Sequence, residues 1–343
     1  MKTPAAHLPA LTGLRFVLAL WVILHHLTGH GQMLEAAALA LPAACYTIIR
    51  GGYLAVTTFF VLSGFVLSRS YSETQWSRRN LLRYGAGRVA RVYPVYLLSL
   101  AVVAPFILAD RTPSKTPLVA AHGLLLQGWL GTIPVNWNTP AWSLSCEIFF
   151  YISFPLAAAV VLRAGWRRTI AVAVAACCMT RVLWACGVPD GVKPVIHLAD
   201  FLMGVAAARA YELLRLRNGA ALYAPAIALS AALIAWPGWL PPGVDLNTAL
   251  RPLNGMLLIG LAAGGGATAR ALSARFVVYL GKSSYAMYIL HVPILWWYLR
   301  WSRSASAAVY LVAVIAISAL VYRFVEEPAN RWLRARVHGA LQA

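Results

Sequence analysis

The sequence has 343 residues, of which 61% are hydrophobic and only 11% are charged, and its mean hydropathy is +0.69. This composition excludes a pair of soluble domains and indicates a polytopic membrane protein with many apolar runs of spanning length. Lys and Arg number 29 against 10 Asp and Glu, which gives a formal net charge of +19. Such an excess is typical of basic cytoplasmic loops, and without a soluble basic domain it argues against nucleic-acid binding.

The first apolar segment, residues 11–30, carries three ionisable side chains, Arg15, His25 and His26. A helix turns about 100° per residue, so Arg15 and His26 share one face, about 16 Å apart along the axis. Ionisable groups inside membrane segments usually face a bundle interior or a watery cavity. Two interpretations stay open from these residues alone: a functional pair, or a cytoplasmic anchor with an interfacial histidine.

The second span is expected at about 51–69, where Ser63 and Gly64 allow close helix packing. The basic stretch 76–91 interleaves arginines with leucines and a tyrosine, as an interfacial amphipathic segment does. The third span is expected at about 93–109.

The stretch 118–140 is apolar only in its first half and then turns rich in Gly, Pro and Asn. A complete span here would place every later basic loop outside, so the positive-inside rule predicts a re-entrant or outer-surface segment. The remaining spans are expected at about 141–162, 169–187, 195–213, 220–237, 249–266, 276–298 and 306–325.

The predicted fold is therefore an all-α polytopic transmembrane helix bundle of about ten spans with both termini cytoplasmic. It would form a single integral membrane domain over 1–343, because no stretch outside the membrane is long enough for an appended soluble domain. The five cysteines show no metal spacing, and no metal is expected.

Several motifs, in order along almost the whole chain, resemble those of the acyltransferase 3 family of integral membrane acyltransferases, which modify surface polysaccharides and other exported glycans. They are the Arg15–x10–His26 pair, 58–65, Arg88 and Arg91 before Tyr93-Pro94, 138–147 with Phe150 and Tyr151, 284–291, and Glu327-Pro328.

The resemblance implies a multi-pass enzyme of the bacterial inner membrane. It would move an acyl group, most simply acetyl, from cytoplasmic acyl-CoA to a hydroxyl of a glycan such as exopolysaccharide or lipopolysaccharide, free or lipid-linked. Acyl-CoA is then the donor substrate, and no permanently bound cofactor is expected. His26 is the expected catalytic base, with His25 as the alternative, because a histidine titrates near neutrality.

The arginine motif residues are expected to hold the donor's phosphates, because a planar guanidinium suits phosphate recognition. Arg88 and Arg91 are expected at the cytoplasmic mouth of the third span, and Arg15 lies on the same side. Glu147 is expected on the outer side of its span, either orienting the histidine or holding the acceptor, and a structural ion pair is equally open.

Trp142 and Asn138 are candidates for acceptor binding, since an aromatic face stacks on sugars and an amide binds hydroxyls. Interfacial packing and turn formation are their alternative roles. Arg181 and Asp200 are expected at similar depth and to pair structurally, and His197 shares their layer. Packing is the expected role of His291. Three residues are expected to close the bundle on its cytoplasmic side: Glu326, Glu327 and Arg331.

A secondary transporter or flippase of a small solute or glycolipid is the alternative function, because buried charges and a broken span also suit that class. Against it, the sequence shows no paired half-chain symmetry with matched interrupted helices.

Overall fold

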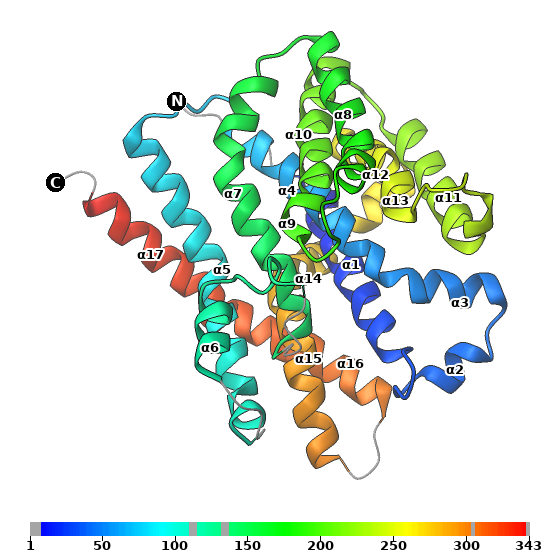
Figure 1. Cartoon of the computed structure of the whole chain (residues 1–343), viewed down its shortest axis with the longest axis vertical. Helices are drawn as coiled ribbons and strands as arrows, with labels where there is room; N and C mark the ends of the chain where they lie inside the picture. The colour runs from blue at the N-terminus through cyan, green and yellow to red at the C-terminus, as the bar shows by residue number, and fades with distance from the viewer. Residues whose placement is uncertain (1–7, 110–114, 132–136, 303–305, 341–343) are drawn as a thin grey trace. The chain divides into compact units, whose positions relative to one another are not determined.

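The computed structural model describes residues 8–109, 115–131, 137–302 and 306–340, and within these ranges every regular element is a helix (Figure 1). The chain forms two compact units. Unit 1 comprises residues 1–72, 153–189 and 195–282, and unit 2 comprises residues 73–152, 190–194 and 283–343. Each unit is therefore assembled from three separate stretches of sequence.

Unit 1 contains most of the helices. They are α1 (Pro9–Leu27), α2 (Glu35–Leu39), α3 (Ala43–Arg50), η1 (Gly51–Tyr53), α4 (Leu54–Tyr71), the second half of α7 (Trp142–Val161), α8 (Trp166–Ala185), α10 (Leu198–Leu214), α11 (Ala220–Ala235), η3 (Pro237–Trp239), α12 (Leu246–Ala263), α13 (Gly266–Leu272) and α14 (Arg275–Lys282). Helix α10 contacts α4, α8 and α12, while α1 lies against α14 and α4.

The contact between α4 and α10 is close because each helix places a glycine against the other's backbone. A Cβ on Gly64 would clash with the carbonyl oxygen of Phe201, and one on Gly204 would clash with that of Val61. Small residues let apolar helices approach each other in this way. The packing role predicted for Gly64 is confirmed.

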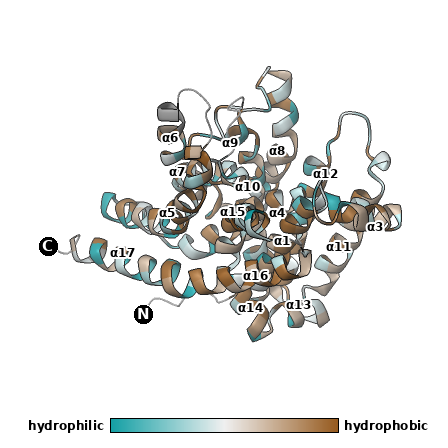
Figure 2. Cartoon of the chain, turned by 90° about the horizontal axis from the view of Figure 1, so that it is seen from below, coloured by the Kyte–Doolittle hydropathy of each residue, from teal (hydrophilic) through white to brown (hydrophobic). Residues whose placement is uncertain are grey.

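Unit 2 is built around a long helix, α5. Its elements are α5 (Arg78–Ala109), α6 (Lys115–Gly123), η2 (Thr139–Ala141), the first half of α7, α15 (Ser284–Trp301), α16 (Ala307–Val321), the π-helical turn η4 (Tyr322–Glu326) and α17 (Glu327–Ala340). The short α9 (Lys193–Ile196) begins in unit 2. Helix α17 runs beside α5, and α15 contacts α5 and α16 (Figure 1). Hydrophobic residues dominate α16, whereas hydrophilic ones recur along α17 (Figure 2).

In the part of the chain that the structure describes, six helical stretches are long and apolar enough to cross a membrane, or seven if the bent pair α12 and α13 counts as one span. Helices occupy all ten segments in which spans were expected. Some, such as α11 with 16 residues, are shorter than a full span. The chain is thus a multi-pass, all-helical membrane protein, while the count of ten and the cytoplasmic termini stay predictions.

Three expected segments differ in detail. The stretch 76–91 is not separate from the third span, because α5 runs unbroken from Arg78 to Ala109 and accommodates Pro94 and Pro105 inside it. The span expected at 276–298 is divided at Ser283 into α14 and α15. In the stretch 118–140, the described residues form the end of α6, turns and the start of the short η2, so they contain no spanning helix. Residues 132–136 of that stretch lie outside the described ranges.

Candidate active site

Both histidines near the end of α1 bind backbone carbonyls through Nδ1. His25 Nδ1 lies 2.6 Å from the carbonyl oxygen of Arg50, and His26 Nδ1 lies 2.9 Å from that of Val22. A carbonyl oxygen only accepts hydrogen bonds, so each Nδ1 donates and, in the neutral ring, Nε2 is the basic nitrogen. The two half-buried rings meet edge to face with centroids 5.3 Å apart. If either neutral ring takes up a proton, it does so at Nε2.

The corner between α3 and α4 fixes this end of α1. A Cβ on Gly52 would clash with the carbonyl oxygen of Trp21 and lie 2.7 Å from Cβ of His25, so only glycine fits there. Trp21 Nε1 donates to the carbonyl of Ile48 at 2.8 Å, and the Arg50 guanidinium donates to the carbonyl of His25 at 3.1 Å. The arginine thereby satisfies a carbonyl in the last turn of α1, where helical partners are lacking.

Arg50 and Gly52 were not singled out from the sequence. The available signal was the run Arg50-Gly51-Gly52 directly before an apolar span, because paired glycines next to an ionisable helix indicate a close backbone approach.

Arg15 lies on the same unbroken helix as His26, as predicted. Eleven residues of helix separate them by about 16 Å, so the two side chains do not act on one atom. Arg15 is half-buried, and its neighbours Leu14 and Gly13 are buried.

In unit 2, Arg91 is held by a carboxylate and an aromatic ring. Its guanidinium forms an ion pair with Glu326, whose side chain is almost completely buried. It also lies over the ring of Tyr285, 5.3 Å from the centroid, and the Tyr285 hydroxyl donates to the carbonyl of Val92 at 2.6 Å. Arg91 therefore has a structural partner of its own. The pairing of Glu326 with Arg91 was not foreseen, and its expected place on the cytoplasmic side stays a prediction.

Arg88 lies between two aromatic rings, one turn before Arg91 on α5. Its guanidinium carbon is 5.8 Å from the ring centroid of Tyr84 and 5.5 Å from that of Tyr151. The Tyr84 hydroxyl donates to the carbonyl of Tyr151 at 3.0 Å, which fixes the two rings relative to each other. These contacts hold the guanidinium in one position through cation–π attraction.

Glu147 belongs to the same cluster. The Tyr151 hydroxyl donates to Glu147 Oε2 at 2.9 Å, and the carboxylate lies close enough to Arg91 for their charges to interact. The sequence placed Glu147 on the outer side and the arginines at the cytoplasmic mouth, and this separation is wrong. Tyr151 joins them, because its ring centroid lies 5.5 Å from the Arg88 guanidinium carbon and its hydroxyl donates to Glu147.

Asn138 joins two of the sequence motifs. Its Nδ2 donates to the carbonyl of Ile289 at 2.8 Å and to Ser99 Oγ at 3.1 Å. Its buried Oδ1 accepts no hydrogen bond from any residue in the ranges given above. The Tyr288 hydroxyl contacts Ser143 Oγ at 3.0 Å, so the motifs 138–147 and 284–291 meet directly.

Trp142 is covered on one face by a lysine. Nζ of Lys193 lies 4.2 Å from the Trp142 ring centroid, a cation–π contact. Lys193 is held in place by its own backbone N–H, which donates to the carbonyl of Gly128 at 3.1 Å. A sugar that stacked on this face of Trp142 would have to displace the lysine.

The buried charge pair of unit 1 differs from the predicted one. Asp200 pairs with Arg251, whereas Arg181 donates to the carbonyl of Gly243 at an exposed position. Several helices can place an arginine at the depth of Asp200. The way the helices pack decides that the partner comes from α12 and not from the end of α8. His197 Nδ1 lies 2.8 Å from the other oxygen of Asp200, so His197 completes this pair.

His291 is fully buried, and its Nδ1 donates to the carbonyl of Tyr288 at 2.7 Å, in agreement with a packing role. Glu327 contacts Arg323 and Arg331 at 3.4 and 3.8 Å. Among the described residues no group of three His, Cys, Asp or Glu side chains is arranged to hold a metal ion.

The predicted site residues thus form two groups, each described within its own unit. Unit 1 holds Arg15, His25 and His26, and unit 2 holds Arg88, Arg91, Asn138, Trp142 and Glu147. Tyr151, Tyr285 and Glu326 are further members of the unit 2 cluster.

A family model described as an acyltransferase domain, that of the acyltransferase 3 family, matches residues 8–323. The chain is 29% identical to acyltransferase MdmB of Streptomyces mycarofaciens over 98% of this chain and 95% of that protein. It is 28% identical to O-acetyltransferase OatA of Staphylococcus aureus, but over only 48% of this chain and 27% of OatA. A putative O-acetyltransferase of the same species, SACOL0978, is 22% identical over 95% of this chain and 58% of its own length. No solved structure matches the chain significantly.

The family match covers the predicted site residues of both units, from Arg15 to Trp142 and Glu147, and ends just before Glu326. The match therefore favours an acyltransferase over the transporter or flippase considered as the alternative. The chain belongs to the acyltransferase 3 family and is an acyltransferase.

Proposed function

We propose that this acyltransferase is an O-acetyltransferase that takes acetyl from cytoplasmic acetyl-CoA and transfers it to a hydroxyl of an exported glycan at the bacterial inner membrane. The observation that carries the proposal is the arrangement on α1. A histidine with Nδ1 bound to a carbonyl, and hence a basic Nε2, shares one continuous helix with an arginine about 16 Å away. Two relatives named as O-acetyltransferases support acetyl as the transferred group.

If the acetyl group passes directly from the thioester to the acceptor, Nε2 of His26 accepts the proton of the acceptor hydroxyl while the hydroxyl oxygen attacks the thioester carbonyl. The tetrahedral intermediate collapses with cleavage of the carbon–sulfur bond, and the imidazolium returns the proton to the leaving thiolate. The base is needed because an alcohol at neutral pH is a weak nucleophile. Hydrogen-bond donors around the developing oxyanion lower the barrier further.

Arginines serve the phosphates of the donor in this proposal. Arg88 is the foremost candidate, since a guanidinium already held by aromatic rings binds phosphate with little loss of entropy. Arg15 is proposed for the same role because it belongs to the family motif on α1. Arg91 was predicted for the same role, but its ion pair with Glu326 means that a phosphate would have to share it.

The acceptor residues are proposed at Asn138, Trp142 and Glu147. The buried Oδ1 of Asn138 is suited to a hydroxyl donor, and the Glu147 carboxylate, oriented by Tyr151, accepts from another. A glycan or lipid-linked glycan presents many such hydroxyls.

The test uses membrane vesicles from cells that express the chain, supplied with radiolabelled acetyl-CoA after collapse of all ion gradients. Label in extracted glycan, and its loss in Arg88→Gln membranes at equal expression, is the expected result. Label that requires an ion gradient, or that appears equally in membranes without the protein, would contradict the proposal.

A further inference from the structure

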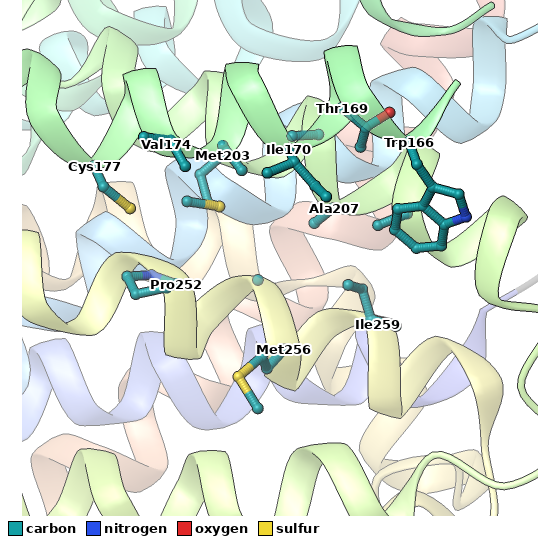
Figure 3. A pocket seen from close by; sticks show the side chains of 14 residues that line it. Trp166, Thr169, Ile170, Val174, Cys177, Met203, Ala207, Pro252, Met256 and Ile259 are labelled. Atoms are coloured by element: carbon teal, nitrogen blue, oxygen red, sulfur yellow. The ribbon is translucent and has the colours of Figure 1, made fainter. Parts of the chain in front are cut away.

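A groove with an almost wholly apolar lining lies in unit 1 between α8, α10 and α12 (Figure 3). Its volume is about 360 Å³. Of its lining residues none is charged, and the hydroxyl of Thr169 is engaged by the carbonyl of Gly165 at 3.1 Å. The lining offers nothing to a hydrated ligand, so its chemistry fits a hydrocarbon chain.

The groove runs along α8 from Cys177 at one end to Trp166 at the other, opposite Pro252 and Ile259 of α12 (Figure 3). Eleven helical residues rise about 16 Å, close to the ~15 Å hydrocarbon thickness of a single leaflet. Helix α8 is long and apolar enough to cross the membrane, and its Ile170 is 55% exposed. The groove therefore opens toward lipid.

The Trp166 end of the groove is strongly basic. Arg163, Arg167 and Arg168 flank Trp166 and are exposed, and no acidic residue occurs between positions 153 and 189. On the charge pattern this end is cytoplasmic, and a tryptophan beside arginines is typical of the headgroup level. Basic clusters of this kind attract the anionic lipids of the cytoplasmic leaflet.

We propose that the groove binds one acyl chain of an anionic phospholipid, with the headgroup phosphate at Arg167 and Arg168. The length of the groove and the charge at its mouth together select this occupant. A zwitterionic lipid also has a phosphate, but its own cation offsets it, so its headgroup adds no net negative charge beside the arginines. An exported lipid-linked glycan would present its headgroup at the opposite end. The inference concerns a site separate from the acyl-transfer residues and does not depend on the proposed function.

The test is native mass spectrometry of the full chain in mild detergent with equimolar phosphatidylglycerol and phosphatidylcholine of identical acyl chains. Wild type is expected to retain phosphatidylglycerol preferentially, and Arg167→Gln with Arg168→Gln to lower the ratio of the two bound lipids by about fivefold per arginine. Ala173→Trp, which fills the groove from half-buried Ala173, is expected to abolish retention. The matched control replaces two exposed arginines elsewhere, Arg270→Gln with Arg275→Gln, and keeps the wild-type ratio.

Equal retention of the two lipids by wild type would overturn the proposal. An unchanged ratio of bound lipids in the Arg167/Arg168 variant would do the same. So would displacement of phosphatidylglycerol by an equimolar polyprenyl-linked glycan. A second measurement serves if Ala173→Trp fails to fold. Phosphatidylglycerol with brominated chains is expected to quench Trp166 at lower mole fraction than brominated phosphatidylcholine, read as the difference between wild type and Trp166→Phe. Identical quenching curves would also refute the site.

Discussion

Arg251 donates a 2.6 Å hydrogen bond from Nε to Oδ1 of Asp200, and both side chains are buried, with 1% and 0% of their surface exposed. The same guanidinium donates to the carbonyl of Ala176 at 2.7 Å and to Thr180 Oγ1 at 3.0 Å. One arginine on α12 therefore links α8 and α10. Each nitrogen of the guanidinium and each oxygen of the carboxylate has a hydrogen-bond partner. Buried charges are tolerated under this condition.

Breaking this pair on one side is expected to destabilise the protein strongly. Arg251→Met leaves the Asp200 carboxylate with only His197, and should lower the free energy of unfolding by about 3–5 kcal/mol. The double variant Asp200→Leu with Arg251→Met should recover most of that loss, because no uncompensated charge remains. Thermal unfolding in detergent measures both, with Arg181→Met as the exposed-arginine control. A double variant no more stable than Arg251→Met would contradict this account of the pair.

Gly52 is expected to tolerate no side chain. Gly52→Ala forces the corner between α3 and α4 away from Trp21 and His25, so the bond from His25 Nδ1 to the Arg50 carbonyl should lengthen and acetyl transfer should fall. A core overpacking of this size costs about 1–3 kcal/mol. Gly238→Ala is the control, because a Cβ there meets no atom within 4 Å. Equal activity and stability of the two variants would show that the close approach is unimportant.

Substitutions of Arg88 and of Arg91 are expected to have different effects. Arg88→Gln should raise KM for acetyl-CoA about tenfold or more while leaving stability near wild type, since a charged hydrogen bond to phosphate is lost. Arg91→Gln should mainly lower stability, because it leaves Glu326 buried without its cation.

The compensating variant distinguishes these roles. Adding Glu326→Gln to Arg91→Gln should restore the melting temperature, since the uncompensated carboxylate is removed. Recovery of stability without recovery of KM would assign Arg91 to the donor site as well. A large stability loss in Arg88→Gln would mean that its aromatic contacts are structural.

Tyr151 is expected to act by positioning Glu147. Tyr151→Phe removes only the hydroxyl that donates to Glu147 Oε2, and should lower kcat about tenfold through a net loss near 1–1.5 kcal/mol. Glu147→Gln should be at least as severe, and the double variant no worse than Glu147→Gln alone. Additive losses would show that the two side chains work independently.

Much of the fold follows from hydropathy, because apolar runs of spanning length have few alternatives to a helix. Helices occupy every expected segment, and the shared face of Arg15 and His26 follows from helical geometry alone. The break at Ser283 was not predicted, because apolar residues continue on both sides of it and no proline marks it. Gly281, just before the break, packs against the backbone of Thr12, a tertiary contact that hydropathy does not encode.

Partners of buried charges were the hardest part to predict. Depth in the membrane suggested Arg181 as the ion-pair partner of Asp200. The lateral packing of the helices instead brings Arg251, which precedes a proline and was not predicted as a partner, against Asp200. Arg91 and Glu326 are 235 residues apart, and Asn138 and Ile289 are 151 apart. No periodicity within one helix encodes such contacts, whereas the motifs that contain them were recognisable.

The central claim is that His26 is the base for acetyl transfer, and its most direct test compares His26→Ala with His25→Ala. Label from acetyl-CoA in membrane-extracted glycan is measured at matched expression, with thermal stability as the check on folding. The account predicts that His26→Ala is folded and loses transfer, whereas His25→Ala retains a measurable rate. Wild-type transfer by folded His26→Ala would contradict the assignment and move the role to His25 or Glu147.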